Sequence, residues 1–411
     1  MNQPDNPSAY QRRRFLQQVG AAGLAGAAAS ALGAPTASAS AASGTKPQAG
    51  ATPIKHIIVC CQENRSFDSY YGKYANLPSG YGIPAGWSNP NGSGGTVKPF
   101  HFPNLTGNAY DPNHSWSSIH SEWDQGKMDG FYTTNGKNSL GYFEAADLPY
   151  YYSLLPKYTL SANYFCGVLS ETYPNRLVLY SGTSGGNTSN SINNGTLDYP
   201  CILDLLKSNS ITFKNYNFHC PSNYSILALF KNWATGGTSN ELNQSITQFM
   251  DDCANNTLPQ VSFITEAPPY DEHPPANIHT GETMIESIIS AVQKSAAWES
   301  TAVFVMYDEG GGFFDHIAPP QLDAYGPGIR VPLLVVSPYA KTNYVDTAFS
   351  DHSSVLKFIE YVFALPTLAS INHQFDTSTP TTNNATGGKA FPPRDGNAKL
   401  SDLTQCFNFA A

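Results

Sequence analysis

The chain has 411 residues, of which 41% are hydrophobic, 12% are aromatic and only 13% are charged. This composition is too aromatic for a disordered protein, and the length suits one large α/β domain with a substantial core. The net charge of -9 argues against a nucleic-acid partner, because nucleic-acid-binding proteins carry clustered Lys and Arg.

The first 41 residues have the pattern of a twin-arginine export signal. Arg12–Arg14 precede Phe15 and a weakly apolar, Ala- and Gly-rich stretch over 19–32, and small residues at 37–41 offer cleavage sites. An uncleaved membrane anchor is the alternative, but the stretch is short and mild beside the roughly 20 apolar residues that span a bilayer. We therefore expect export by the twin-arginine translocation machinery, to the periplasm or the exterior. The predicted divisions are a signal peptide over 1–41, a flexible tether over 42–53 and a single domain with long loop insertions over 54–411.

The seven cysteines are an odd count and form no C-x-x-C pair, so a structural zinc site is not expected. Cys60 and Cys61 lie inside a predicted strand and are expected to be core residues. An oxidising destination permits disulfides among four of the other cysteines. The candidates are Cys201, Cys220, Cys253 and Cys406, and the sequence leaves their pairing open.

Short apolar runs alternate with helical patterns along the folded part of the chain. The predicted strands are 56–61, 211–216, 261–265, 302–307 and 333–336, and the predicted helices are 202–206, 283–298 and 353–363, the last capped by Asp351 or Ser350. We expect a long loop over 74–102 and surface coil over 367–411. Strands that alternate with helices imply a mostly parallel central sheet with helices on both faces.

Two acidic motifs follow predicted buried strands. Glu63 and Asn64 come after the strand at 56–61, and Asp308 and Glu309 come after the strand at 302–307. The carboxyl ends of strands in an open α/β sheet are where ligand sites form. Three acids and an amide at one edge would repel each other strongly, so the pattern predicts a bound cation. Oxygen ligands suit calcium or manganese, while nearby imidazoles would admit iron or zinc, and the metal's identity stays open.

Thr172 stands at the predicted start of a helix, in Glu171-Thr172-Tyr173-Pro174-Asn175-Arg176. Pro174 falls in the first turn, where its missing N–H costs nothing, and Thr172 is well placed as the N-cap. Two interpretations are open. Thr172 is an ordinary cap, or its hydroxyl, beside a metal and the positive end of a helix, is a nucleophile. Arg176 has a similar pair of roles, structural support or phosphate contact.

Four histidines lie next to acids in predicted loops. They are His114, His273 beside Glu272, His316 beside Asp315, and His352 beside Asp351. One such histidine is an ordinary loop residue, but four of the 10 His beside loop acids indicate an active site. Arg65 and Asp68 are expected to form a buried pair that braces the metal loop.

Together these motifs resemble the bacterial phospholipase C and acid phosphatase family of phosphoesterases. That family includes plant non-specific phospholipases C and belongs with alkaline-phosphatase-like folds. The resemblance rests on Glu-Asn-Arg-Ser-Phe-Asp, Thr-x-Pro-Asn-Arg, Glu-His-Pro and Asp-Glu-x-Gly-Gly-Phe-x-Asp-His, and it runs from about Ile54 to Phe363. It implies a three-layer α/β, alkaline-phosphatase-like fold in which 54–411 is a single phosphoesterase catalytic domain.

The resemblance also implies roles for individual residues. Glu63, Asn64, Asp308 and Glu309 would hold one divalent metal ion, with Thr172 as a nucleophile that also touches the metal. His114, His273 and His316 would bind the phosphoryl group or protonate the leaving alcohol. Arg65, Asp68, Arg176, Glu272, Asp315 and His352 would support these residues without contacting substrate.

The reaction implied is hydrolysis of phosphate esters, first of all a phospholipase C-type cleavage of phospholipids to a phosphorylated headgroup and diacylglycerol. An acid phosphatase that acts on phosphomonoesters is the alternative among enzymes. A non-catalytic periplasmic protein that binds metal or phosphate is the alternative of another class. The sequence leaves the ester, the headgroup and the oligomeric state open.

Overall fold

The computed structural model of the protein describes residues 48–217, 226–234, 244–371, 381–382 and 389–409. The chain separates into two units, Met1–Ser43 and Gly44–Ala411. The predicted signal over 1–41 lies outside the described residues. Within the second unit, the Gly50 N–H donates to the carbonyl of Tyr361 at 2.9 Å, so the described end of the predicted tether lies against the helix that contains Tyr361.

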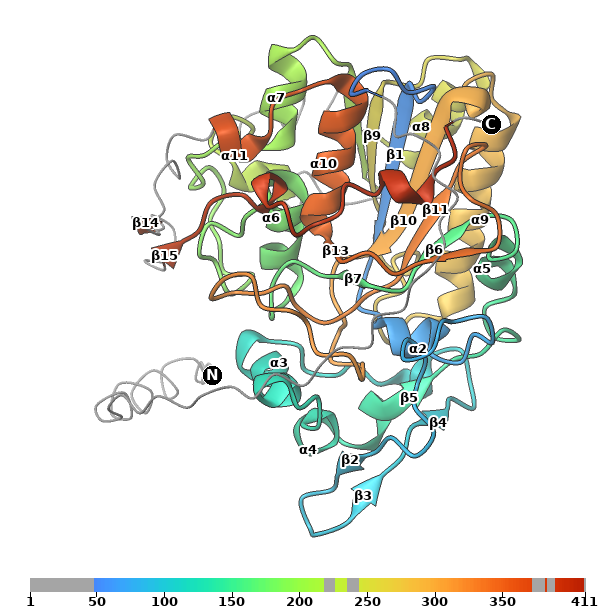
Figure 1. The fold of residues 1–411 in the computed structure, drawn as a ribbon, viewed down its shortest axis with the longest axis vertical. Coiled ribbons are helices and arrows are strands. Elements are labelled where there is room, and N and C mark those ends of the chain that lie inside the picture. Colours follow the sequence, from blue (N-terminus) through green and yellow to red (C-terminus); the bar gives the residue numbers. More distant parts are fainter. Residues whose placement is uncertain (1–47, 218–225, 235–243, 372–380, 383–388, 410–411) are drawn as a thin grey trace, which may run out of the picture. The chain divides into compact units, whose positions relative to one another are not determined.

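A seven-stranded sheet forms the centre of the unit that begins at Gly44 (Figure 1). In spatial order its strands are β12 (Tyr344–Asp346), β6 (Thr159–Ser161), β11 (Leu333–Val336), β10 (Thr301–Tyr307), β1 (His56–Gln62), β9 (Val261–Thr265) and β8 (Phe213–Asn217). Four of the six pairings are parallel, and β11 runs antiparallel to both of its neighbours. The prediction of an α/β fold with a mostly parallel sheet is confirmed.

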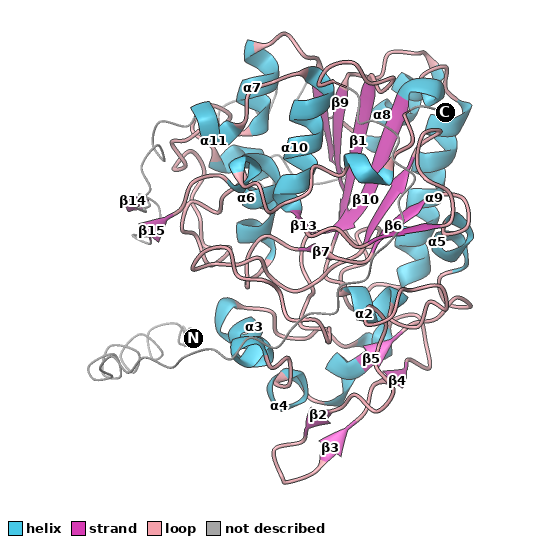
Figure 2. Ribbon diagram, viewed as in Figure 1, coloured by secondary structure: helices cyan, strands magenta, loops and turns pink. Residues whose placement is uncertain are grey.

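Helices cover both faces of this sheet (Figure 2). The α-helices of the described residues are α2 (Phe67–Tyr71), α3 (Trp116–Trp123), α4 (Phe131–Asn135), α5 (Pro149–Leu154), α6 (Thr172–Ser181), α7 (Ile202–Ser208), α8 (Ile246–Ala254), α9 (Ile278–Lys294), α10 (His352–Phe363) and α11 (Leu368–Ile371). Phe304 of β10 packs on Phe358 of α10. Phe263 of β9 is in register with Phe304, so both side chains point to the same face of the sheet. Tyr216 of β8 is in register with Ile264 and therefore points to the opposite face. There it packs on Phe249 of α8, which completes three layers.

The buried strands and the helix caps explain where these elements begin and end. Every residue of β1 after His56 is buried, as expected for a strand covered on both faces. Helix α9 begins at Ile278, five residues before the predicted start at 283, because the Asn277 side chain caps it by accepting from the His279 N–H. Helix α10 is capped by Asp351, as predicted.

The prediction of surface coil over 367–411 is wrong for the segment that contains Arg394. Arg394 and Asp395 are buried. Arg394 donates to Asp323 at 2.7 Å and 2.9 Å and to Asp351 at 3.1 Å. The polar composition misled because these polar groups are paired with one another inside the protein.

The predicted loop over 74–102 contains only short strands. These are β2 (Asn89–Pro90), β3 (Thr96–Val97) and β4 (Phe100–His101), and the other short strands of the chain are β5 (Gly141–Tyr142), β7 (Tyr164–Phe165), β13 (Ser350–Asp351), β14 (Thr381–Thr382) and β15 (Lys389–Ala390). Among the described residues no helix has both the length and the apolar character needed to span a bilayer. The six described cysteines are free and buried, which confirms the core placement of Cys60 and Cys61, and Cys220 lies outside the described residues.

Candidate active site

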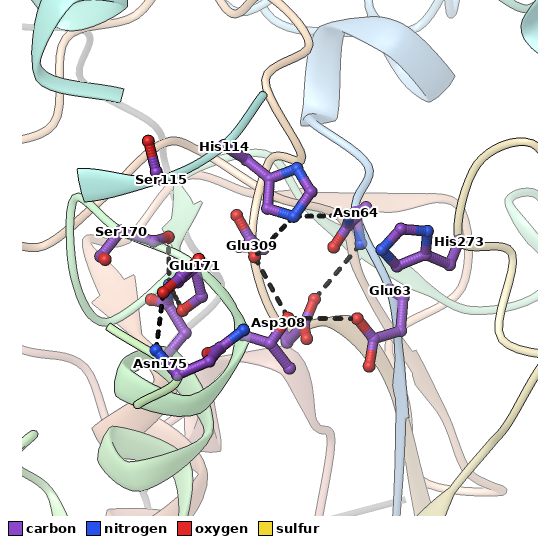
Figure 3. Close-up of polar contacts among 12 residues, drawn as sticks. Glu63, Asn64, His114, Ser115, Ser170, Glu171, Asn175, His273, Asp308 and Glu309 are labelled. Atoms are coloured by element: carbon purple, nitrogen blue, oxygen red, sulfur yellow. Dashed lines mark hydrogen bonds and ion pairs between the residues drawn. The ribbon is translucent and has the colours of Figure 1, made fainter. Parts of the chain in front are cut away.

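The carboxyl ends of three neighbouring strands bring the predicted motifs together. β1 lies between β10 and β9, so the residues that follow these strands meet at one edge of the sheet. The Asp308 N–H donates to the Gln62 carbonyl at 3.0 Å, and the Glu63 N–H donates to the Asp271 carbonyl at 2.9 Å. Figure 3 shows Glu63, Asn64, Asp308 and Glu309 gathered there. We call Glu63, Asp308 and Glu309 the strand-end acids.

Local backbone geometry explains why Asn and Gly occupy two positions beside these acids. Asn64 has a φ of 62°, in the left-handed region that Asn tolerates better than most residues. Its N–H donates to Asp308 Oδ1 at 3.2 Å. Gly311 approaches Asn64 so closely that a Cβ there would lie 2.5 Å from the Asn64 Cβ. A side chain at position 311 would therefore displace Asn64.

Thr172 is the first residue of α6, and the N-cap is Glu171, so the prediction that Thr172 is the N-cap is wrong. The Thr172 hydroxyl instead faces two strand-end acids. Its Oγ1 lies 3.5 Å from Glu63 Oε2 and 3.4 Å from Glu309 Oε1. The hydroxyl is thus presented to the acids at the positive end of the helix, which favours the nucleophile interpretation over the ordinary cap.

Asn175 holds the turn that leads into α6, a role that the sequence did not reveal. It is buried, and its Oδ1 accepts from the Val168 N–H at 2.7 Å. Its Nδ2 donates to the carbonyls of Ser170 and Glu171 at 2.7 Å and 3.1 Å, as Figure 3 shows. The motif contained Asn175, but its partners are backbone groups, which leave no signature in side-chain spacing.

Arg176 forms ion pairs with two of the strand-end acids. Its Nη2 lies 2.7 Å from Glu63 Oε1, and its Nε lies 3.1 Å from Asp308 Oδ2. These contacts support the structural interpretation of Arg176. Two of the three strand-end acids thus share one guanidinium, which leaves the three acids with an excess of two negative charges if all are ionised.

The pKa values of these acids reflect that excess. Burial raises the pKa of Asp308 and of Glu309 well above the usual range, and the neighbouring acids raise both further. Burial acts in the same direction on Glu63, but Arg176, His273, His114 and a hydrogen bond with Asp308 together outweigh it and leave the pKa of Glu63 below its ordinary value. A cation among these groups would stabilise their ionised forms.

The oxygen atoms at this edge fit a metal ion. Within the described residues, Asn64 Oδ1 and Glu309 Oε2 are buried and make no hydrogen bond. Buried polar atoms are nearly always paired, so two orphaned oxygens beside the strand-end acids point to a missing partner. A divalent cation would pair with both and offset the charge excess, and an all-oxygen set suits a hard cation.

His114 and His273 are oriented toward the same centre. The Nδ1 of His114 lies 2.7 Å from the Pro112 carbonyl, and the Nδ1 of His273 lies 2.7 Å from the Pro274 carbonyl. A carbonyl can only accept, so each Nδ1 carries a proton and each Nε2 is left to face the centre. The Nε2 of His114 lies 3.4 Å from Asn64 Nδ2 and 4.0 Å from Glu309 Oε1, and the two rings are 5.8 Å apart (Figure 3).

The structure places His316 in a different cluster. We call Asp68, Asp315, His316 and Arg330 the Arg330 cluster. His316 Nδ1 lies 2.6 Å from Asp68 Oδ2, and its Nε2 lies 3.2 Å from the Gly80 carbonyl. Among the contacts of the described residues, none joins His316 to Thr172 or to the strand-end acids. Its predicted role at the phosphoryl group stays a prediction.

Arg330 accounts for the charge of this second cluster. It donates to Asp68 Oδ1 at 2.9 Å and to Asp315 Oδ2 at 3.0 Å. The predicted Arg65–Asp68 pair is therefore wrong, because Asp68 pairs with an arginine 262 residues away. The ligand atoms of Asp68, Asp315 and His316 lie within 4.8 Å of one another and resemble a cation site, but Arg330 and a protonated His316 together balance the charge of the two carboxylates.

The remaining predicted supporting residues lie behind the acids. Arg65 donates to the Glu272 carbonyl at 2.7 Å, which links the loop after β1 to the loop that carries His273. The buried Glu272 carboxylate accepts from three tyrosine hydroxyls, those of Tyr70, Tyr151 and Tyr307. His352 Nε2 lies 2.7 Å from the Asp308 carbonyl.

Several curated bacterial and plant proteins are similar to this chain. "Non-hemolytic phospholipase C" of Burkholderia pseudomallei is 28% identical over 487 residues, which cover 97% of this chain and 65% of that protein. "Phospholipase C B" of Mycobacterium tuberculosis is 28% identical over 97% of this chain and 86% of its own length. "Non-specific phospholipase C3" of Arabidopsis thaliana is 26% identical over 77% of this chain and 70% of its own length. The chain spans between about half and two thirds of the length of three of the bacterial phospholipases C that it matches.

A solved structure from the alkaline phosphatase superfamily of Vibrio parahaemolyticus aligns with 87% of this chain and 71% of its own. The sequence identity is 9% and the TM-score is 0.42. The family comparison is stronger, because the sequence model of the Phosphoesterase family matches residues 54–366, which include the strand-end acids, Thr172, His114 and His273. The chain belongs to the Phosphoesterase family.

Proposed function

We propose that the protein is a metal-dependent phosphoesterase in which Thr172 attacks the phosphorus of a phosphate ester. The observation that carries this proposal is the Thr172 hydroxyl, placed 3.4 Å from Glu309 and 3.5 Å from Glu63. The charge of these acids, with the orphaned oxygens of Glu309 and Asn64, calls for a cation. Family membership and the phospholipase C names of the relatives support the same chemistry.

The protein's own groups supply the proton transfers of the proposed reaction. The Thr172 oxygen forms a bond to phosphorus, and its proton passes to a neighbouring carboxylate, of which Glu309 Oε1 is the nearer. The ester P–O bond breaks, and the leaving oxygen takes the Nε2 proton of His114 or His273 in its imidazolium form, since the Nε2 atoms face the centre. Water then cleaves the phosphothreonine, which releases the phosphorylated product and restores the Thr172 hydroxyl.

Glu63, Asn64, Asp308, Glu309 and Thr172 would hold the divalent metal ion. When bound, the metal would neutralise phosphate oxygens and lower the pKa of the Thr172 hydroxyl. Asn64 Nδ2 and His114, only 3.4 Å apart, would bind the remaining phosphate oxygens together. His316 takes a supporting role in this proposal, because both of its ring nitrogens already have partners.

The substrate class that we propose is a phospholipid, cleaved to a phosphorylated headgroup and diacylglycerol. The names of the relatives favour this class over phosphomonoesters, which an acid phosphatase with the same residues would cleave. A panel of phosphatidylcholine, phosphatidylethanolamine, sphingomyelin and p-nitrophenyl phosphate separates the two. A preference for the monoester would reverse the order of these alternatives.

The central test replaces Thr172 by Ala and, as a matched control, by Ser. Loss of a covalent nucleophile typically costs more than about 1000-fold in kcat, so T172A should be nearly inactive, whereas T172S keeps a hydroxyl and measurable turnover. Metal content by elemental analysis should stay close to stoichiometric in both variants. If T172A keeps wild-type activity, the nucleophile assignment is wrong. If no variant and no wild-type preparation cleaves any ester yet metal binds, the protein is a non-catalytic binding protein.

We also propose export by the twin-arginine machinery, on the pattern of Arg12–Arg14 and Phe15. N-terminal sequencing of the mature protein would check it, with a first residue expected within or just after 37–42. A mature protein that retains Met1 would contradict it.

A further inference from the structure

We infer that Asn135 is a positioning residue that fixes the His114 loop in the active centre. The inference rests on the proposed function and deepens it, since it names a group that acts on the reaction through His114. Asn135 lies at the end of α4, outside the motifs that mark the strand-end acids and Thr172.

The Asn135 side chain holds the residue before His114 by both of its backbone groups. Asn135 Oδ1 accepts from the Asn113 N–H at 2.8 Å, and Asn135 Nδ2 donates to the Asn113 carbonyl at 2.9 Å. A primary amide is the side chain that can accept from an N–H and donate to a carbonyl of the same residue. Only one orientation of the amide satisfies both contacts, so the contacts fix the Asn135 amide as well as Asn113.

The buried acid Glu122 accepts a further hydrogen bond from the Asn135 amide. Asn135 Nδ2 also donates to Glu122 Oε1, so both of its N–H groups are used. Glu122 is fully buried on α3, and no cation contacts it among the described residues. Burial raises the pKa of Glu122 well above its usual range. The contact between Asn135 and Glu122 therefore ties α4 to α3, the helix that begins just after His114.

Two further contacts connect this arrangement to the active centre. The carbonyl of Pro112 accepts from His114 Nδ1, so the residues next to Asn113 orient the imidazole itself. Gly312 lies in the loop that follows the strand-end acids, and a Cβ there would be 2.6 Å from Pro112 Cβ and 3.0 Å from Asn135 Nδ2. The loop of Asn113 is thus packed against the loop of Glu309 without space between them.

The accuracy of this placement matters because the His114 contacts are already at the limit of hydrogen bonding. Its Nε2 is 3.4 Å from Asn64 Nδ2 and 4.0 Å from Glu309 Oε1. A displacement of about 1 Å in a group that positions a reacting atom can cost about 100-fold in rate. A loop released from Asn135 would permit such a displacement of His114.

Asn89 provides a matched control in the same part of the fold. It is buried, its Nδ2 donates to the Met128 carbonyl at 3.2 Å, and its Oδ1 accepts from the Tyr132 N–H at 3.1 Å. It therefore makes the same kinds of backbone contact as Asn135 and donates to one carbonyl, but it does not hold the His114 loop.

The experiment compares N135D, N89D and E122A in the full-length, metal-loaded enzyme, each with and without H114A. Asp keeps an acceptor for the Asn113 N–H but cannot donate to the Asn113 carbonyl or to Glu122. We expect N135D to lower kcat/KM by about 100-fold, mostly through kcat, and E122A to lower it less because both contacts to Asn113 remain. N89D should lower the melting temperature by a similar amount but leave kcat/KM within about 3-fold of wild type.

The double variants separate positioning from simple loss of stability. In the H114A background, N135D should cause no further loss, because its effect passes through His114. Additive losses, or an equal loss from N89D, would overturn the inference. If N135D does not fold, the same coupling is measured with E122A. If H114A alone has no effect, the inference fails, whereas the proposed nucleophile is tested separately by T172A.

Discussion

The strand-end acids and the acids of the Arg330 cluster come from the same two sequence motifs, yet the two groups differ in the cations that balance their charge. The strand-end acids are three carboxylates with one guanidinium, that of Arg176. In the Arg330 cluster, two carboxylates face one guanidinium and one imidazole. The first group is left with excess negative charge, and the second is neutral when His316 is protonated.

The hydrogen bonds of the two groups differ in the same way. Asn64 Oδ1 and Glu309 Oε2 are buried without a partner, whereas each carboxylate oxygen of Asp68 and Asp315 accepts at least one hydrogen bond. A cluster of acids in a sequence motif therefore does not by itself indicate a metal site. The balance of counter-charge and the orphaned oxygens distinguish a site that awaits a ligand from one that stabilises the fold.

The largest effect that we expect from this comparison is on activity and metal content. Glu309→Gln removes a charge from the strand-end acids, so kcat/KM should fall on the order of 1000-fold and metal content should fall with it. Removal of metal by a chelator should abolish the activity of the wild type. Asp315→Asn is the matched change in the Arg330 cluster and should leave metal content unchanged. Full metal content in E309Q would contradict the assignment of the metal site.

The next largest effect is on stability. Arg330→Met leaves Asp68 and Asp315 buried without their shared cation, so the free energy of unfolding should fall by about 3–5 kcal/mol. Chemical denaturation followed by fluorescence would measure it. Lys127 forms an exposed ion pair with Asp124, and Lys127→Met should be nearly neutral. A similarly small effect of R330M would show that the Arg330 cluster does not stabilise the fold.

The smallest effect concerns the pH dependence that His316 confers. Both ring nitrogens face groups that only accept, and burial is outweighed by Asp68, so the pKa of His316 is raised. A raised folded-state pKa stabilises the fold fully below the unfolded value of about 6.5, and this contribution is lost as pH rises through the folded value.

His316→Gln tests this dependence. The wild type should be more stable than H316Q by about 1.5–3 kcal/mol at pH 5.5, and the difference should shrink toward pH 9. Thermal or chemical unfolding across this range measures the difference. A constant difference from pH 5.5 to pH 9 would show that the protonation of His316 does not contribute to stability in this pH range.

Much of the fold could be predicted because apolar runs determine buried strands directly. Val261–Thr265 and Leu333–Val336 are strands over the predicted residues, since a run of buried aliphatic side chains has few other stable arrangements. The direction of β11 could not be predicted, because a buried strand looks the same in sequence whether it runs parallel or antiparallel to its neighbours.

The strand-end acids could be predicted for a related reason, whereas their support could not. Acids placed directly after buried strands must meet at one sheet edge, so their proximity follows from topology. Arg330 pairs with an acid 262 residues away, and Asn135 pairs with backbone groups. Neither partnership has a spacing that a sequence displays, and the Arg65–Asp68 prediction failed because it assumed that nearby opposite charges pair.

The contacts of Arg394 have a consequence for the order in which the protein folds. Its side chain donates to the Gly167 carbonyl, 227 residues earlier, and its N–H donates to the Gly182 carbonyl at the end of α6. The segment that carries Thr172 is therefore held at both ends by a residue that the ribosome adds late. Contacts over such separations close long loops and form slowly. Thr172, the proposed nucleophile, thus reaches its final surroundings only after residue 394 has been synthesised.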